Sequence, residues 1–230
     1  MKLGNRLSLG SRGVKGTTFT PANIANGYAW YQYDTGITID GSNKVLSWDS
    51  QIVSGNQLTS TSGNQPTYSS GDIIFGNNFM DFTTWQPGSF SAYFVCKVTA
   101  GSISNEELLS FNSFNFMRIQ NPTELRVRIG DSTNNNITFT NSLSVNTWMI
   151  LGVEWLGSGD GTINIYQDTH YSTPSGSATD TGTLSGFDNL GARTSIPFDG
   201  DMREIIFINN ELSSSDRNNL MTYLKDKHSI

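Results

Sequence analysis

Acidic residues are the first candidates for chemistry, because a glycosidase works with two carboxylates held close together. On a strand, two such side chains point the same way only when they are two or four residues apart. Glu106 and Glu107 are adjacent, and Glu154 has no acid at either spacing. Asp199 and Asp201 have the right spacing, but the glycine between them is typical of a turn. The acidic residues therefore predict no catalytic pair, and we expect no enzymatic activity.

Histidine, cysteine and aspartate would build a metal or nucleophile site. The chain has two histidines, His170 and His228, and one cysteine, Cys96, which are too few for a zinc site. It also lacks the nucleophile elbow Gly-x-Ser-x-Gly and the phosphate-binding loop of nucleotide hydrolases. We expect no cofactor. Ca²⁺ stays open as an alternative, because it is bound by loop oxygens, although isolated turn aspartates more often bond to their own backbone. The loop aspartates are Asp160, Asp168, Asp180, Asp188, Asp199 and Asp201.

Two arginines, Arg126 and Arg128, are candidates for a surface that contacts another molecule. They alternate with Leu125, Val127 and Ile129, so on a strand they share one polar face. Arginine is enriched at interfaces, so a surface interaction is one interpretation. A solvated face with two like charges is the other, and the sequence slightly favours it.

The N-terminal segment is basic and glycine-rich. Residues 1–16 contain Lys2, Arg6, Arg12 and Lys15 and no acid, whereas the whole chain has a net charge of −6. Such a segment either lacks fixed structure or becomes ordered against a partner. We predict that residues 1–22 form an extended arm whose four basic side chains bind a partner, with residues 23–230 as one domain. The acidic remainder argues against nucleic-acid binding.

The elements that must position these residues are predicted to be short strands. Aromatic residues make up 11% of the chain and charged residues only 15%, a mixture typical of pleated sheets. The clearest strand is Phe90 to Thr99, where Phe90, Ala92, Phe94, Cys96 and Val98 alternate with more polar residues. Cys96 is therefore expected to be an inert core residue. Residues 50–71 are expected to form a long loop with at most a short strand near Leu58. The other main strands are expected at Glu107–Phe111, Phe114–Gln120, Glu124–Gly130, Ile137–Thr140, Trp148–Trp155, Thr162–Gln167 and Met202–Ile208.

One helix is predicted, and it closes the chain. Ser213, Ser214 or Ser215 can cap it, and Leu220, Met221 and Leu224 form an apolar stripe at helical spacing. No 18-residue apolar run is present, so we expect no membrane span. The pattern predicts an all-β protein: a two-sheet antiparallel jelly-roll β-sandwich with a short C-terminal α-helix and an extended N-terminal arm.

Two groups of motifs carry a family resemblance over about residues 28–230. The N-terminal half has Ala29-Trp30-Tyr31, Val45-Leu46-Ser47-Trp48-Asp49, Ser54-Gly55-Asn56, Asn64-Gln65-Pro66-Thr67-Tyr68 and Ile74-Phe75-Gly76. The C-terminal half has Phe198-Asp199-Gly200-Asp201-Met202-Arg203-Glu204-Ile205-Ile206-Phe207-Ile208, then Glu211-Leu212-Ser213 and a helix ending at Tyr223-Leu224. On these motifs the chain resembles the concanavalin A-like lectin/glucanase superfamily, and within it the laminin-G-like jelly-roll domains of phage and bacterial structural proteins. The glucanase carboxylates are absent, so the resemblance implies the fold and no activity.

The opening Lys2-Leu3-Gly4-Asn5-Arg6-Leu7-Ser8-Leu9 is similar to the start of phage virion proteins that bear this domain. The resemblance implies a non-enzymatic virion structural protein, a capsid decoration or tail/fibre-associated protein anchored partly by its basic arm. Its partners would be other virion proteins, such as a capsid or tail protein, and it would form a homo-oligomer. A carbohydrate-binding module for host-surface glycans is the alternative, followed by a glycoside hydrolase or lyase.

Overall fold

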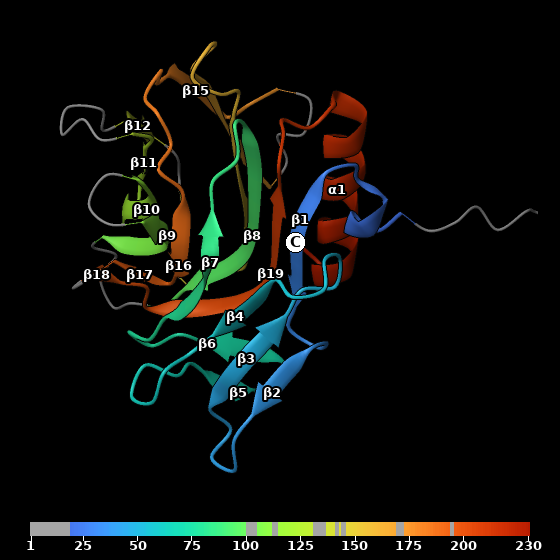
Figure 1. Cartoon of the computed structure of the whole chain (residues 1–230), viewed down its shortest axis with the longest axis vertical. Helices are drawn as coiled ribbons and strands as arrows, with labels where there is room; N and C mark the ends of the chain where they lie inside the picture. Colours follow the sequence, from blue (N-terminus) through green and yellow to red (C-terminus); the bar gives the residue numbers. More distant parts are fainter. Residues whose placement is uncertain are drawn as a thin grey trace, which may run out of the picture.

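The structure is a computed structural model. It describes residues 19–99, 105–111, 115–130, 137–140, 143, 146–168, 173–193 and 196–230. Two antiparallel sheets form a sandwich, as predicted, and one helix follows the last strand (Figure 1).

The first sheet, sheet A, has the strand order β15-β14-β13-β8-β19-β6-β5, and β1 also pairs with β19. Its central strand β8 runs from Phe90 to Val98, and the five apolar residues predicted for one face of this strand all lie in the core between the sheets. The remaining strands are β1 (Gly27–Gln32), β5 (Thr67–Ser69), β6 (Asp72–Ile74), β13 (Met149–Trp155), β14 (Thr162–Gln167), β15 (Gly176–Thr179) and β19 (Gly200–Ile208).

The second sheet, sheet B, has the order β12-β11-β10-β9-β16-β7-β4-β3-β2. The segment 50–71 contains β4 as expected near Leu58, and also β5, which pairs with β6. The polar sequence of this segment did not predict β5, because a three-residue strand gives little periodicity. The strands of sheet B are β2 (Ile37–Ile39), β3 (Val45–Asp49), β4 (Gln57–Thr59), β7 (Met80–Trp85), β9 (Glu106–Phe111), β10 (Asn115–Asn121), β11 (Glu124–Arg128), β12 (Ile137–Thr140) and β16 (Phe187–Leu190). A small hairpin, β17 (Ala192–Arg193) with β18 (Ile196–Pro197), follows β16.

The outer face of sheet A is apolar and is covered by helix α1 (Ser214–His228), which lies beside β1 and β19 (Figure 1). Ser213 is the N-cap, since its side chain accepts a hydrogen bond from the backbone N–H of Asp216. Leu220, Met221 and Leu224 are buried as predicted, in a second cluster with residues of β8, β13 and β19. The 3₁₀ turn η1 (Pro21–Asn23) precedes β1.

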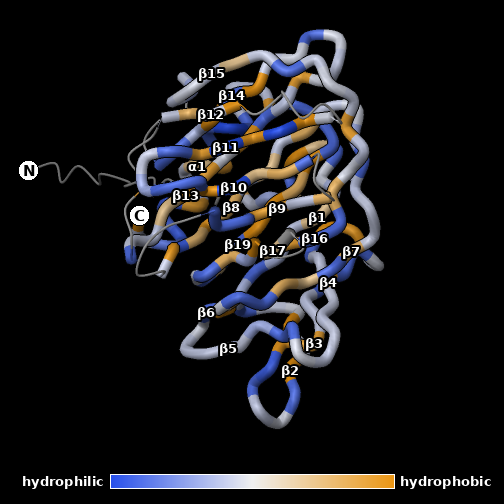
Figure 2. The backbone as a smooth tube through the Cα atoms, turned by 90° about the vertical axis from the view of Figure 1, so that its left-hand side faces the viewer, coloured by the Kyte–Doolittle hydropathy of each residue, from blue (hydrophilic) through white to orange (hydrophobic). Residues whose placement is uncertain are grey.

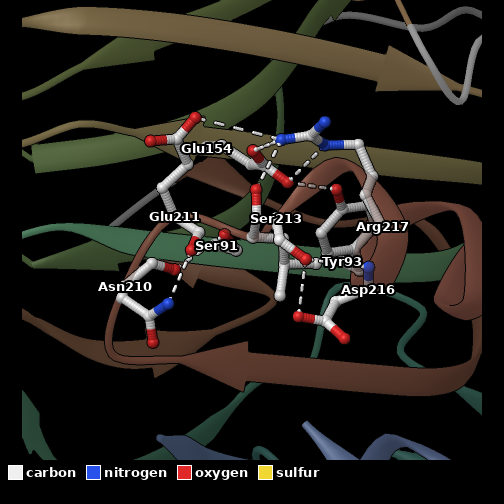
Figure 3. A network of polar contacts seen from close by, with 9 residues as sticks. Ser91, Tyr93, Glu154, Asn210, Glu211, Ser213, Asp216 and Arg217 are labelled. Carbon is white, nitrogen blue, oxygen red and sulfur yellow. Dashed lines mark hydrogen bonds and ion pairs between the residues drawn. The ribbon is translucent and has the colours of Figure 1, made fainter. Parts of the chain in front are cut away.

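Two buried carboxylates fix α1 to sheet A, one near each end of the helix. Near its start, Arg217 donates two hydrogen bonds to Glu154, at 2.9 and 2.7 Å (Figure 3). Near its end, the carboxylate of Glu204 forms an ion pair with Lys227 at 2.9 Å and contacts Nε2 of the His228 imidazole at 2.7 Å. These contacts give Glu154 and His228 structural roles.

We expect Gly152→Ala to lower the free energy of unfolding by about 1–3 kcal/mol, because it overfills a packed site. A Cβ on Gly152 would lie 2.3 Å from Cε1 of Tyr93, a buried ring beneath α1. The matched control is Gly41→Ala, where a Cβ meets no atom within 4 Å. Urea unfolding of both variants measures the difference, and equal stabilities would contradict this packing.

Candidate functional site

The outer face of sheet B carries polar and charged side chains. None of the helices in the described part of the chain packs on it, but the β17–β18 hairpin contacts β9 there through Ala192, whose carbonyl accepts from the hydroxyl of Ser110. Figure 2 looks onto this sheet, with β12, β11, β10 and β9 following one another. Leu125, Val127 and Ile129 point into the core, so Arg126 and Arg128 lie on the outer face, on the side of β11 that their alternation predicts.

Strand pairing brings further residues beside these arginines. Arg118 on β10 lies directly opposite Arg126, and Phe116 lies opposite Arg128. The guanidinium carbons of Arg118 and Arg128 lie 4.6 and 5.0 Å from the centroid of the Phe116 ring. We call Arg118, Arg126 and Arg128 the arginine cluster; it rests on the Phe116 ring, which is only 1% exposed. A cation over an aromatic ring is stabilised electrostatically.

The members of the arginine cluster differ in their partners. Arg118 is almost buried, and its Nε donates to Oε1 of Gln120 at 2.9 Å. Arg126 is half-buried and makes neither a hydrogen bond nor an ion pair with any residue that the structure describes. Its Nε is also shielded from water. An arginine in this state is unusual, since buried donors are nearly always paired.

A second group of polar residues continues across the same face. Phe116 lies opposite Ser110 on β9, and Ser110 lies opposite Asn189 on β16. From Asn189 the cross-strand pairing continues through one residue on each of the next four strands, β7, β4, β3 and β2. We call these five residues the polar row: Asn189, Asp81, Thr59, Ser47 and Thr38. Cross-strand partners share a face of the sheet, so the row and the arginine cluster lie on the same face. Between them, on β9, Ser110 is buried and its hydroxyl donates to the backbone carbonyl of Ala192 in the β17–β18 hairpin.

Asp81 in the polar row has two polar neighbours on β16. Its Oδ1 accepts a hydrogen bond from Nδ2 of Asn189 at 2.8 Å. Burial, and then the negative charge of Asp81, raise the pKa of Asp188 above its ordinary value. Asp81 and Asp188 are therefore close enough to interact electrostatically. They are 107 positions apart in the sequence, so a search for acids two or four residues apart missed them.

The other residues considered for chemistry have different surroundings. The four basic residues Lys2, Arg6, Arg12 and Lys15 lie outside the described residues. Burial raises the pKa of the Cys96 thiol, which fits the expected inert core residue. The side chain of Asp180 accepts hydrogen bonds from the backbone N–H groups of Ile129 and Gly182. Within the described ranges, no helix is long and apolar enough to cross a membrane.

Comparison with known proteins finds similarity at the level of structure. No protein-family model matches the sequence, and no curated protein matches it. The chain is similar to Trypanosoma rangeli sialidase, with a TM-score of 0.62 and 12% identity, over 89% of this chain and 33% of the sialidase. It therefore spans about a third of that protein.

Two other solved structures extend this likeness. The same sialidase in complex with sialic acid aligns with a TM-score of 0.59 and 11% identity, over 89% of this chain and 33% of that chain. The binding domain of Paraclostridial Mosquitocidal Protein 1 aligns with a TM-score of 0.62 and 11% identity, over 89% of this chain and 53% of that chain. At these identities the comparisons show the fold alone, which is the predicted jelly-roll β-sandwich and is consistent with a concanavalin A-like domain.

Proposed function

We propose that this domain binds carbohydrate through the outer face of sheet B. The observation that carries the proposal is the contrast between the two outer faces. That of sheet A is apolar and covered by α1, whereas that of sheet B presents the arginine cluster and the polar row. Sugar hydroxyls need both donors and acceptors, and the amide, carboxylate and hydroxyl groups of the row supply them.

The extent of this face favours an oligosaccharide over a single sugar. Along the polar row, Asn189 on β16 and Thr38 on β2 are separated by four interstrand steps of about 4.8 Å, or about 19 Å in all. The similar structures give further support, since one is a sialidase complex with sialic acid and another is the binding domain of a mosquitocidal protein. Neither is a virion protein, so a virion role, a virion partner and a homo-oligomer remain predictions.

The test is a glycan array followed by calorimetric titration with the oligosaccharide that binds best. We expect longer oligosaccharides to bind more tightly than their monosaccharides. Asp81→Ala removes one hydrogen-bonding group of the polar row and should weaken binding by about tenfold, or about 1.4 kcal/mol. The matched control is Asp72→Ala on sheet A, where Asp72 pairs with Arg203 at 2.7 Å; it should leave binding unchanged. A blank array, or equal affinities for the two folded variants, would contradict the proposal.

The same incubations separate binding from cleavage. We propose that the glycan is bound without being cut, with Asp81, whose Oδ1 accepts a hydrogen bond from Asn189, accepting from sugar hydroxyls through its other oxygen. No new reducing ends should therefore appear. A release of fragments that Asp188→Asn abolishes would instead make this face an active site.

A further inference from the structure

We propose that the arginine cluster binds an anionic group of the glycan, a carboxylate or a sulfate ester, so that the domain prefers acidic oligosaccharides. The inference rests on the proposed function and adds the chemical class of the ligand. It comes from three features of the cluster: an arginine without a partner among the described residues, two like charges on facing residues, and the aromatic ring beneath the cluster.

The first feature is the environment of the Arg126 guanidinium. Three other cations of the domain, Arg203, Arg217 and Lys97, each lie 2.7 Å from a carboxylate oxygen. Arg126 has no such partner among the described residues, and its Nε is shielded from water. Its charge is thus neither paired within this part of the chain nor fully hydrated. An anion with two oxygens would match the planar fork of a guanidinium.

The second feature is the cross-strand position of Arg118 and Arg126. Like charges directly opposite one another on neighbouring strands destabilise a sheet. Arg128 adds a third positive charge two residues along β11. On its other side, Arg118 lies opposite the buried carboxylate of Glu107 on β9. An added anion would therefore act mainly on the half-buried Arg126, whose positive charge faces that of Arg118.

The third feature is the support that holds the arginines in place. Phe116 packs beneath Arg118 and Arg128, and Gln120 accepts a hydrogen bond from Nε of Arg118. Groups that are held in position before binding lose less conformational entropy when a ligand arrives. The arginines are therefore held in position for an oxyanion, while the polar row on the other side of β9 would contact the uncharged part of the glycan.

An acidic polysaccharide fits this surface better than a nucleic acid does. The chain has a net charge of −6, and strong binding to a polyphosphate requires a predominantly basic face. Three arginines at one end of a polar row instead suit a ligand that carries single charges on a hydroxyl-rich chain.

The test compares ligands that differ only in charge. A hexuronic acid oligosaccharide is measured beside its carboxyl-reduced form, and a sulfated oligosaccharide beside its desulfated form, by calorimetry at 50 and 300 mM NaCl. We expect at least one acidic member to bind ten times more tightly or better than its neutral partner, and this preference to fall at high salt. The two pairs of ligands distinguish a carboxylate from a sulfate.

Variants then assign the preference to residues. Arg126→Gln should remove most of the tenfold preference, while Arg126→Lys should keep part of it because the charge remains. Arg203→Gln on sheet A is the control variant and should retain the full preference for the acidic ligand. Equal binding of acidic and neutral ligands with loss in Asp81→Ala would overturn this inference and leave the proposed function standing. Failure of every ligand to bind would overturn both.

Discussion

Replacing Arg217 with Met should lower the free energy of unfolding by about 3–5 kcal/mol, because it leaves the carboxylate of Glu154 buried without its cation. Glu154 is fully buried and Arg217 nearly so. Figure 3 shows both side chains with Tyr93, whose hydroxyl donates to Glu154 at 2.5 Å. Burial raises the pKa of Glu154, and the hydrogen bonds from Arg217 and Tyr93 act against that rise. Without Arg217, the Glu154 carboxylate lowers the free-energy cost of its burial by binding a proton.

Urea unfolding monitored by circular dichroism measures this effect, with Arg203→Met as the matched control. Arg203 also pairs with a carboxylate, but it is partly exposed, so the control should lose no more than about 1 kcal/mol. The double variant Glu154→Leu/Arg217→Met should recover much of the stability, because no buried charge remains. The deficit of Arg217→Met should also shrink from pH 8 to pH 5, where Glu154 is more easily protonated. A deficit no larger than that of the control would show that this pair contributes little.

Replacing Glu204 with Gln should lower the free energy of unfolding at pH 7 by about 2–3 kcal/mol, which is typical of hydrogen bonds to a charged group. Glu204 accepts from Nε1 of Trp30 at 2.6 Å and is paired with Lys227 and His228 at the end of α1. Burial acts to raise the pKa of Glu204, but the hydrogen bonds from His228, Lys227 and Trp30 and the charge of Lys227 lower it overall.

The sign of the pH dependence follows from that lowered pKa. Folded Glu204 binds a proton more weakly than unfolded Glu204, so its stabilisation is complete above the unfolded pKa of about 4.3. It is lost as the pH falls through the lower, folded pKa. The difference between wild type and Glu204→Gln should therefore be large at pH 7 and small near pH 2.5. Glu211→Gln, at an exposed carboxylate, should differ little from wild type at either pH. A Glu204→Gln deficit that does not change with pH would refute this linkage.

Both predictions concern α1, and they bear on function because α1 covers the apolar outer face of sheet A. If the helix detached, the cluster around Trp30, Tyr93 and Ile206 would be exposed to water. Such a surface favours aggregation. The polar contacts at the two ends of α1 therefore help to leave the outer face of sheet B as the polar surface on which a ligand can bind.

The sequence by itself determined the elements whose signal is local. Alternation over Phe90–Val98 is read directly from neighbouring residues, since a pleated strand sends them to opposite faces. The capping serine and the apolar stripe of α1 also lie within a few positions of one another. The outward placement of Arg126 and Arg128 followed from the same rule. The short strand β5 was not predicted, because three residues are too few to show a period.

Only the tertiary structure decided which of these residues meet. Arg217 and Glu154 are 63 positions apart, and Asn189 reaches Asp81 across 108 positions. Arg118 and Phe116 join Arg126 and Arg128 because β10 pairs with β11 in one particular register, and a shift of one residue would turn these side chains into the core. That register depends on packing of the whole inner face. The candidate site is therefore a product of strand order and register, whereas its individual arginines are visible in the sequence.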